Sequence, residues 1–180
     1  NKNISSQLVV KERFGAGSKF TGINLSFSES QTFSRNLHNP IFQPFVKGDE
    51  FTIDMYVTKR KEVKGIVVRE RLKVVEGESK ITKTIKDNKL EKLCQNLALD
   101  LNLYGHVNVQ CIKDNNNEYN IVECNCRYGG ASSLSVDSGL DSFYWFFLET
   151  CGYDLKNYPF LKTDSEKTLI KYSADLLFED

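Results

Sequence analysis

"IVECNCRYGG", residues 121–130, alternates two kinds of side chain. Glu123, Asn125 and Arg127 occupy every second position, and Cys124 and Cys126 stand between them. Because successive side chains of a β-strand point to opposite faces, the polar residues and the cysteines cannot share a face. The stretch therefore has two competing interpretations: half of a thiolate metal site, or a working face that carries a carboxylate, an amide and a cation.

The residues before this stretch predict the first strand of a β-hairpin. HVNVQCI (106–112) alternates as a strand, and the asparagine-rich loop after it suits a turn. With Asp114 opposite Tyr119, Gln110 faces Glu123 at a Cβ separation of about 5 Å. One face then carries the polar residues Asn108, Gln110, Glu123, Asn125 and Arg127. The other is expected to be buried, and it carries Val107, Val109, Cys111, Val122, Cys124 and Cys126.

The polar face offers the ligands of a hard metal ion. Mg²⁺ takes one or two carboxylates and completes its octahedron with water and substrate phosphate. Zinc would need further thiolates or histidines at matching spacing, and His38 and His106 pair with no cysteine motif. We therefore expect structural cysteines rather than a zinc-thiolate interaction module. A solvated acid on an exposed sheet is the plain alternative for Glu123, and its amide and arginine neighbours argue against it.

Composition excludes several classes of partner. Twenty-four basic residues balance twenty-four acidic ones, so no global basic surface is available for nucleic acid or anionic lipid. No apolar run approaches the roughly 20 residues of a membrane span, and no signal peptide opens the sequence. The five cysteines are expected to stay reduced. We expect a cytoplasmic protein without nucleic-acid or membrane partners.

Strands in hairpins, followed by helices, predict an α+β fold with a mostly antiparallel sheet. Strands are expected at residues 7–13, 21–27, 41–46 and 51–57, and Ser28 with Gln31 suggests a capping box for a short helix after the second. A longer helix is predicted from an apolar stripe made by Leu90, Leu93, Cys94, Leu97 and Leu101. A boundary near residues 46–48 divides the chain into 1–46 and 47–180.

Two further segments carry groups that could bind a nucleotide. Lys11 lies in a strand, and the turn after it contains Gly15, Ala16, Gly17 and Ser18, whose backbone N–H groups could approach an anion closely. The turn does not fit the P-loop pattern, and an ordinary hairpin turn is the alternative. In the second segment, residues 43–46 offer backbone groups for a purine edge. There Gln43, Phe45, Val46 and the later acid Glu50 are the candidates.

The order of these motifs resembles the ATP-grasp superfamily, in the branch of the carbamoyl-phosphate synthase large subunit. The motifs are the lysine strand with its glycine turn and serine, then QPFVKGDE (43–50), GHVNVQ (105–110) and ECNCRYGG (123–130). The family's usual forms are a lysine followed by G-x-G-S, then Q-E-F-x-x-G-x-E, N-x-Q and E-x-N-P-R. The resemblance covers residues 7–139. Two positions depart from it: Cys126 replaces a proline, and Pro44 replaces an acid.

The resemblance implies a role for each candidate. Lys11 and the turn Gly15, Ala16, Gly17 and Ser18 would contact the phosphates of ATP, Gln43 to Val46 would form the adenine hinge, and Glu50 would hold the ribose. Gln110, Glu123 and Asn125 would bind Mg²⁺ or Mn²⁺. Arg127, and with it Arg71, would stabilise the transferred phosphoryl group. By strand alternation, Arg69 points to the same face as Arg71. Residues 1–46 would form part of the nucleotide lid, and residues 47–180 the catalytic subdomain.

The implied chemistry is the activation of a carboxylate or bicarbonate by ATP to an acyl phosphate, which an amine attacks. Such a transfer needs positioning and charge neutralisation rather than a protein nucleophile. A non-catalytic nucleotide-binding module of the same fold is the alternative. The family places a domain before the lysine strand, so a missing N-terminal domain, or a second copy of the chain, is a further expected partner.

Overall fold

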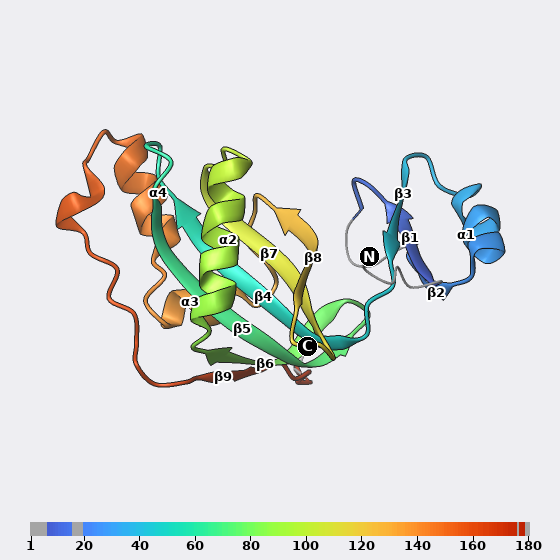
Figure 1. The fold of residues 1–180 in the computed structure, drawn as a ribbon. Coiled ribbons are helices and arrows are strands. Elements are labelled where there is room, and N and C mark those ends of the chain that lie inside the picture. The colour runs from blue at the N-terminus through green and yellow to red at the C-terminus, as the bar shows by residue number, and fades with distance from the viewer. Residues whose placement is uncertain (1–6, 16–19, 176, 179–180) are drawn as a thin grey trace. The chain divides into compact units, whose positions relative to one another are not determined.

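The computed structural model describes residues 7–15, 20–175, 177 and 178. The chain divides into two compact units, residues 1–48 with 76–78, and residues 49–75 with 79–180. The division falls at Gly48, and the role of the first unit as a lid stays a prediction. The mixture of helices and antiparallel strand pairs (Figure 1) confirms the α+β class.

The first unit contains a three-stranded antiparallel sheet and one helix. Its strands are β1 (Leu8–Glu12), β2 (Gly22–Leu25) and β3 (Pro40–Pro44), in the order β2-β1-β3. The helix α1 (Phe27–Ser34) begins at a capping box in which Ser26 accepts from the N–H of Glu29 and Glu29 accepts from the N–H of Ser26. The expected box at Ser28 and Gln31 was therefore wrong by two positions. Ser26 has the extended conformation that an N-cap needs, and Ser28 already lies in the helix.

The second unit is built on a six-stranded sheet. Its strands are β4 (Gly48–Val57), β5 (Val63–Val75), β6 (Glu78–Ile85), β7 (Gly105–Asp114), β8 (Tyr119–Asn125) and β9 (Thr168–Ile170), in the order β8-β7-β4-β5-β6-β9. Its helices are α2 (Asn88–Asp100), α3 (Ser132–Asp137), α4 (Ser142–Thr150) and the 3₁₀ turn η1 (Leu155–Asn157). None of the helices described is long and apolar enough to cross a membrane.

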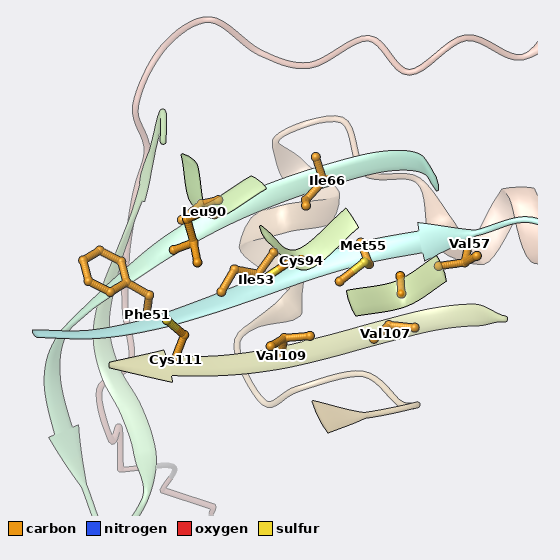
Figure 2. Packing of buried hydrophobic residues seen from close by; sticks show 12 residues of the cluster. Phe51, Ile53, Met55, Val57, Ile66, Leu90, Cys94, Val107, Val109 and Cys111 are labelled. Carbon is orange, nitrogen blue, oxygen red and sulfur yellow. The ribbon is translucent and has the colours of Figure 1, made fainter. Parts of the chain in front are cut away.

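Helix α2 covers one face of this sheet and closes the larger core. Alternate residues of β4, such as Ile53 and Met55, pack with Leu90 and Cys94 of α2 and with Val109 of β7 (Figure 2). Burial of these apolar side chains stabilises the unit by roughly 1.5–3 kcal/mol for each large residue. The stripe predicted for α2 is confirmed for Leu90 and Cys94, which are buried, but Leu101 is 54% exposed because the helix ends at Asp100.

Helices α3 and α4 and the segment after them cover part of the opposite face. Here Tyr56 of β4 and Val67 of β5 pack with Leu140, Trp145 and Leu148. Gly65 is required at this contact, because a Cβ there would lie 2.9 Å from Leu140 Cδ1 and 3.1 Å from Trp145 Cη2. The sheet is thus buried on both faces near α3 and α4.

The hairpin of β7 and β8 confirms the central pairing and corrects its edges. Gln110 lies opposite Glu123, as predicted. The register then shifts by one residue, so Cys111 pairs with Ile121, and Lys113 rather than Asp114 lies opposite Tyr119. The expectation that Val122 joins the buried face was therefore wrong, because Tyr119 and Ile121 pack there instead. Cys126 is exposed, since β8 ends at Asn125.

Candidate active site

Two carboxylate–arginine pairs lie on the face of the sheet that α3 and α4 partly cover. Strand alternation places Asp54 and Glu50 of β4 on this face, and Arg69 and Arg71 of β5 beside them. Asp54 pairs with Arg69, and Glu50 pairs with Arg71. The first pair is fully buried, whereas the Glu50 side chain is 43% exposed. The same polar face therefore has a covered half and an open half.

Asp54 is the centre of the covered half. Its Oδ2 accepts from Arg69 Nη2 at 2.8 Å and from the Ser135 hydroxyl at 2.6 Å. Its Oδ1 accepts from Asn108 Nδ2 at 2.6 Å and from the Ser132 hydroxyl at 2.9 Å. One carboxylate thus joins β4, β5 and β7 to helix α3.

The surroundings of Asp54 keep its carboxylate charged. Burial by itself would raise the pKa of Asp54, but the charge of Arg69 and the groups around the carboxylate outweigh it and hold the pKa well below its ordinary value. His106 contributes from a Nε2–Oδ1 distance of 3.5 Å, which is long for a hydrogen bond but short enough for an electrostatic effect. The covered half is therefore a charged structural anchor.

Arg71 is the centre of the open half. Its Nη1 lies 3.0 Å from Glu50 Oε2 and donates to Gln110 Oε1 at 3.0 Å, and its Nε donates to the Ser79 hydroxyl at 2.9 Å. Burial lowers the pKa of Arg71, and the Glu50 and Glu123 carboxylates oppose that shift. The guanidinium therefore joins four neighbouring strands, β4 to β7, at the place where the polar face opens.

The three predicted magnesium ligands lie together beside Arg71. Gln110 and Glu123 are cross-strand partners, and Asn125 Nδ2 donates to Glu123 Oε1. One carboxylate and two side-chain amides fit the oxygen preference of Mg²⁺, and half a turn of the Asn125 amide would aim its oxygen beside the carboxylate. Among the described residues, no group of three or more His, Cys, Asp and Glu side chains that could hold a metal ion occurs, at this site or at another. A metal held here would thus depend on the amides and on a ligand's phosphates.

Arg127 follows these residues but does not join them. It is exposed, and its Nη1 donates to the carbonyl of Tyr128 at 3.2 Å. Tyr128 itself is held firmly, because its ring stacks between His106 and Phe143 with centroid distances of 3.8 Å on each side. The Gly129 N–H donates to the Ser132 hydroxyl at 2.9 Å, which links this segment to Asp54. The backbone that carries Arg127 is thus anchored, and its side chain is exposed.

The nucleotide candidates of the first unit form a separate set. Lys11 lies in β1 opposite Ile41 of β3, and Gln43 lies opposite Val9. Phe45 continues the pairing, since its N–H donates to the Gln7 carbonyl at 2.9 Å. Gly15 and Val46 lie outside the strands, and Ala16, Gly17 and Ser18 fall outside the described residues.

Glu12 fixes the end of β1 next to Lys11. Its carboxylate accepts from the backbone N–H groups of His38 at 2.6 Å and Asn39 at 3.0 Å. The bond from Asn39, followed by that from His38, lowers the pKa of Glu12. This contact ties β1 to the loop before β3, and it reinforces the pairing of the strand that carries Lys11 with the strand that carries Gln43.

Comparison with family models gives a match over residues 36–170 to a family described as "ATP-grasp in the biosynthetic pathway with Ter operon". The chain belongs to this ATP-grasp family. The superfamily named from the motifs is thereby confirmed. Comparison with curated proteins gives no match.

Several solved structures share this ATP-grasp fold. Biotin carboxylase from Campylobacter jejuni, in a complex named for β-γ-ATP, has a TM-score of 0.75 at 13% identity, covering 93% of this chain and 42% of that one. The biotin carboxylase domain of 2-oxoglutarate carboxylase from Hydrogenobacter thermophilus, a dimer with MgADP and bicarbonate, has a TM-score of 0.73 at 12% identity and coverages of 93% and 41%. N5-carboxyaminoimidazole synthetase from Staphylococcus aureus has 0.64 at 16%, with coverages of 87% and 43%. The chain thus spans less than half the length of these structures.

The sequence analysis did not predict the covered half of the polar face. Asp54 lies on the polar face of the alternating strand β4, where the sequence by itself predicts a solvated acid and gives no local signal of burial. Arg69 was expected on the same face as Arg71, and the register confirms that placement by pairing it with Thr52. The contacts with Ser132 and Ser135 join residues about 80 positions apart, and no local pattern announces them.

Proposed function

We propose that the chain binds Mg·ATP and activates a carboxylate or bicarbonate as an acyl phosphate for attack by an amine, in the manner of the carbamoyl-phosphate synthase branch. Gln110, Glu123 and Asn125 would hold the metal, and Arg71 and Arg127 would neutralise the transferred phosphoryl group. The single observation that supports this most is the apposition of Gln110 and Glu123 beside the Arg71 guanidinium. This arrangement brings two of the proposed metal ligands and a positive charge together on the open half of the polar face.

The nucleotide itself would be contacted by residues 11–18 and 43–46 and by Glu50. Lys11 and the turn Gly15 to Ser18 would hold the phosphates, and Gln43, Phe45 and Val46 the adenine. Pro44 has no N–H to donate, whereas Phe45 uses its own N–H toward Gln7. Contacts in the hinge would therefore come from carbonyl oxygens, side chains and the N–H of Val46. Glu50 would hold the ribose while it remains paired with Arg71.

A non-catalytic nucleotide-binding module is the second candidate. The observation that favours it is the engagement of the proposed ligands with protein groups, since Gln110 accepts from Arg71 and Glu123 accepts from Asn125. A domain that only senses nucleotide would need these residues for Mg·ATP binding but not for turnover. ADP release stimulated by a carboxylate distinguishes the two candidates.

The test is titration calorimetry with Mg·ATP, followed by an ADP-release assay on the full-length protein with a panel of carboxylates and amines. Glu123→Gln should weaken Mg·ATP binding at least roughly tenfold, since it removes the charged metal ligand. Glu118→Gln, in the exposed hairpin loop, is the matched control and should leave affinity unchanged. Equal affinities for Glu123→Gln and wild type would disprove the metal site. Binding without ADP release under any combination would favour the second candidate.

A further inference from the structure

Arg71 holds the oxygen that the proposed metal site needs. Its Nη1 donates to Gln110 Oε1 at 3.0 Å and lies at the same distance from Glu50 Oε2. Its side chain is only 6% exposed, so the guanidinium is packed in place rather than free to swing in solvent. The position beside Gln110 is thus occupied by a positive charge that belongs to the protein.

A bare divalent cation at Gln110 and Glu123 would be repelled by that charge. The Glu50 carboxylate offsets part of this repulsion, so we expect the remaining charge to weaken binding of a free ion roughly tenfold. A metal–nucleotide complex differs, because its phosphates carry a negative charge that offsets both the metal and the guanidinium. The same arginine that disfavours a free ion therefore favours the ion when it arrives with phosphates.

Glu50 and Ser79 would keep Arg71 in reach throughout. If the Gln110 oxygen turned to a metal, the guanidinium would retain the Glu50 carboxylate and the Ser79 hydroxyl, at 3.0 Å and 2.9 Å. The arginine would thus lose one acceptor and gain a phosphate oxygen, without leaving its place between β4 and β6. Retention of a charged acceptor avoids an unpaired buried cation.

We propose that Arg71 is a specificity-determining residue that excludes free divalent cations and admits the metal–nucleotide complex. Arg71 donates to the Gln110 oxygen, and in this proposal it releases that oxygen to a metal that arrives with phosphates. This inference rests on the proposed metal site, and it adds a selectivity that the ligand set alone would not have. Without the arginine, Glu50, Glu123 and Gln110 would form an acidic site open to any hard cation.

The experiment measures binding of Mn²⁺ alone, by electron paramagnetic resonance, and of Mn·ATP, by calorimetry. Wild type should bind free Mn²⁺ weakly. Arg71→Met should bind free Mn²⁺ roughly tenfold more tightly than wild type, and it should bind Mn·ATP less tightly. The preference for Mn·ATP over free Mn²⁺ should therefore fall by more than roughly tenfold. Lys73→Met removes an equal charge from an exposed position of the same strand and is the matched control. Arg71→Gln provides a second neutral variant that keeps a hydrogen-bonding side chain in case the methionine variant does not fold.

The outcomes separate this inference from the proposed function. Unchanged free Mn²⁺ affinity in folded Arg71→Met or Arg71→Gln overturns the role of Arg71, and so does an equal rise in Lys73→Met. Adding Glu123→Gln to either neutral variant should abolish the gained Mn²⁺ binding. If it does not, the ion sits elsewhere and the inference fails. If Glu123→Gln as a single change leaves the affinity for Mn·ATP at its wild-type value, the proposed metal site itself is wrong.

Discussion

Asp54 and Glu123 stand on the same face of one sheet, and their surroundings give them different tasks. Asp54 accepts hydrogen bonds from four side chains and is fully buried. Glu123 lies near the end of an edge strand with amide neighbours and is partly exposed. A carboxylate whose acceptor positions are saturated by protein donors is a structural group. Glu123 is partly exposed and lies beside amides, so it is not enclosed by the protein as Asp54 is.

Replacement of Asp54 by asparagine should destabilise the second unit strongly. The change leaves Arg69 buried without its counter-charge, and breaking a buried pair in this way costs about 3–5 kcal/mol. Urea unfolding followed by the fluorescence of Trp145, which lies in the core of the same unit, measures the loss. Glu118→Gln breaks the exposed pair with Lys89 and should have a much smaller effect. Comparable losses for the two variants would contradict the anchor role of Asp54.

The contribution of the Asp54 charge should depend on pH only under acid conditions. Its pKa is lowered in the folded protein, so its contribution is fully present above the ordinary aspartate pKa of about 3.9 and is lost as the pH falls toward the folded value. The difference in unfolding free energy between wild type and Asp54→Asn should therefore be constant from about pH 7 to pH 5 and shrink below about pH 4. A difference that already shrinks near neutral pH would show that the carboxylate is not held charged.

Four of the five thiols should divide into two classes of reactivity. Burial raises the pKa of Cys94 and of Cys111 to about 12 each, so both stay protonated at neutral pH and are sterically shielded. Cys126 and Cys151 are exposed. Alkylation with iodoacetamide, mapped by mass spectrometry, should label Cys126 and Cys151 in the native protein and Cys94 and Cys111 only in urea. Equal labelling rates for Cys94 and Cys151 would show that Cys94 is not buried in the core.

At the scale of elements, local pattern predicted the central pairs and failed at the ends. The register predicted from Asp114 opposite Tyr119 brought Gln110 opposite Glu123, and the structure has that central pair although Lys113 takes the place opposite Tyr119. One residue away the register shifts, and the partner of Cys111 becomes Ile121. The shift brings the larger side chains of Ile121 and Tyr119 against the core under α2. Such a choice depends on the packing of another element, so the hairpin sequence by itself does not determine it.

The arginines show the same limit. Strand alternation placed Arg69 and Arg71 on one face, but their different roles depend on what covers each of them. Helix α3 supplies Ser135 to Arg69, whereas β6 supplies Ser79 to Arg71. These partners come from elements that sequence spacing cannot align. Motif order therefore predicted which residues lie in the open half, and it did not predict the division of the polar face into an open and a covered half.

Gly139, between α3 and α4, should be far less tolerant of substitution than Gly152 after α4. Both have left-handed φ angles, +101° and +85°, which cost an alanine about 1–2 kcal/mol. A Cβ at Gly139 would also lie 2.2 Å from the carbonyl oxygen of Leu161, whereas nothing lies within 4 Å of one at Gly152. Gly139→Ala should therefore lower the unfolding free energy at least twice as much as Gly152→Ala in urea titrations. Similar losses would mean that the 161–163 segment does not pack on this turn.

At the scale of the whole molecule, the two units differ in how much core each possesses. The second unit has two buried clusters, one on each face of its sheet. Among residues 7–15 and 20–48 of the first unit, Val10 is the one fully buried apolar side chain. A sheet with so small a core opens locally at little cost. A ligand that binds such a unit is therefore expected to slow its local opening.

Hydrogen exchange should therefore resolve the two units and report where the nucleotide binds. Without ligand, the amides of β1 and β3 should exchange much faster than those of β4, β5 and β7, because opening the first unit exposes little apolar surface. Mg·ATP at about 100 times its Kd should slow exchange in β1 and β3 by up to roughly 100-fold, if the first unit holds the nucleotide. Lys11→Met should abolish this protection, and Arg35→Met, which removes an exposed charge at the end of α1, should not. Slowing in β7 and β8 without any change in β1 and β3 would confine ligand binding to the second unit and disprove the roles given to Lys11 and to Gln43 to Val46.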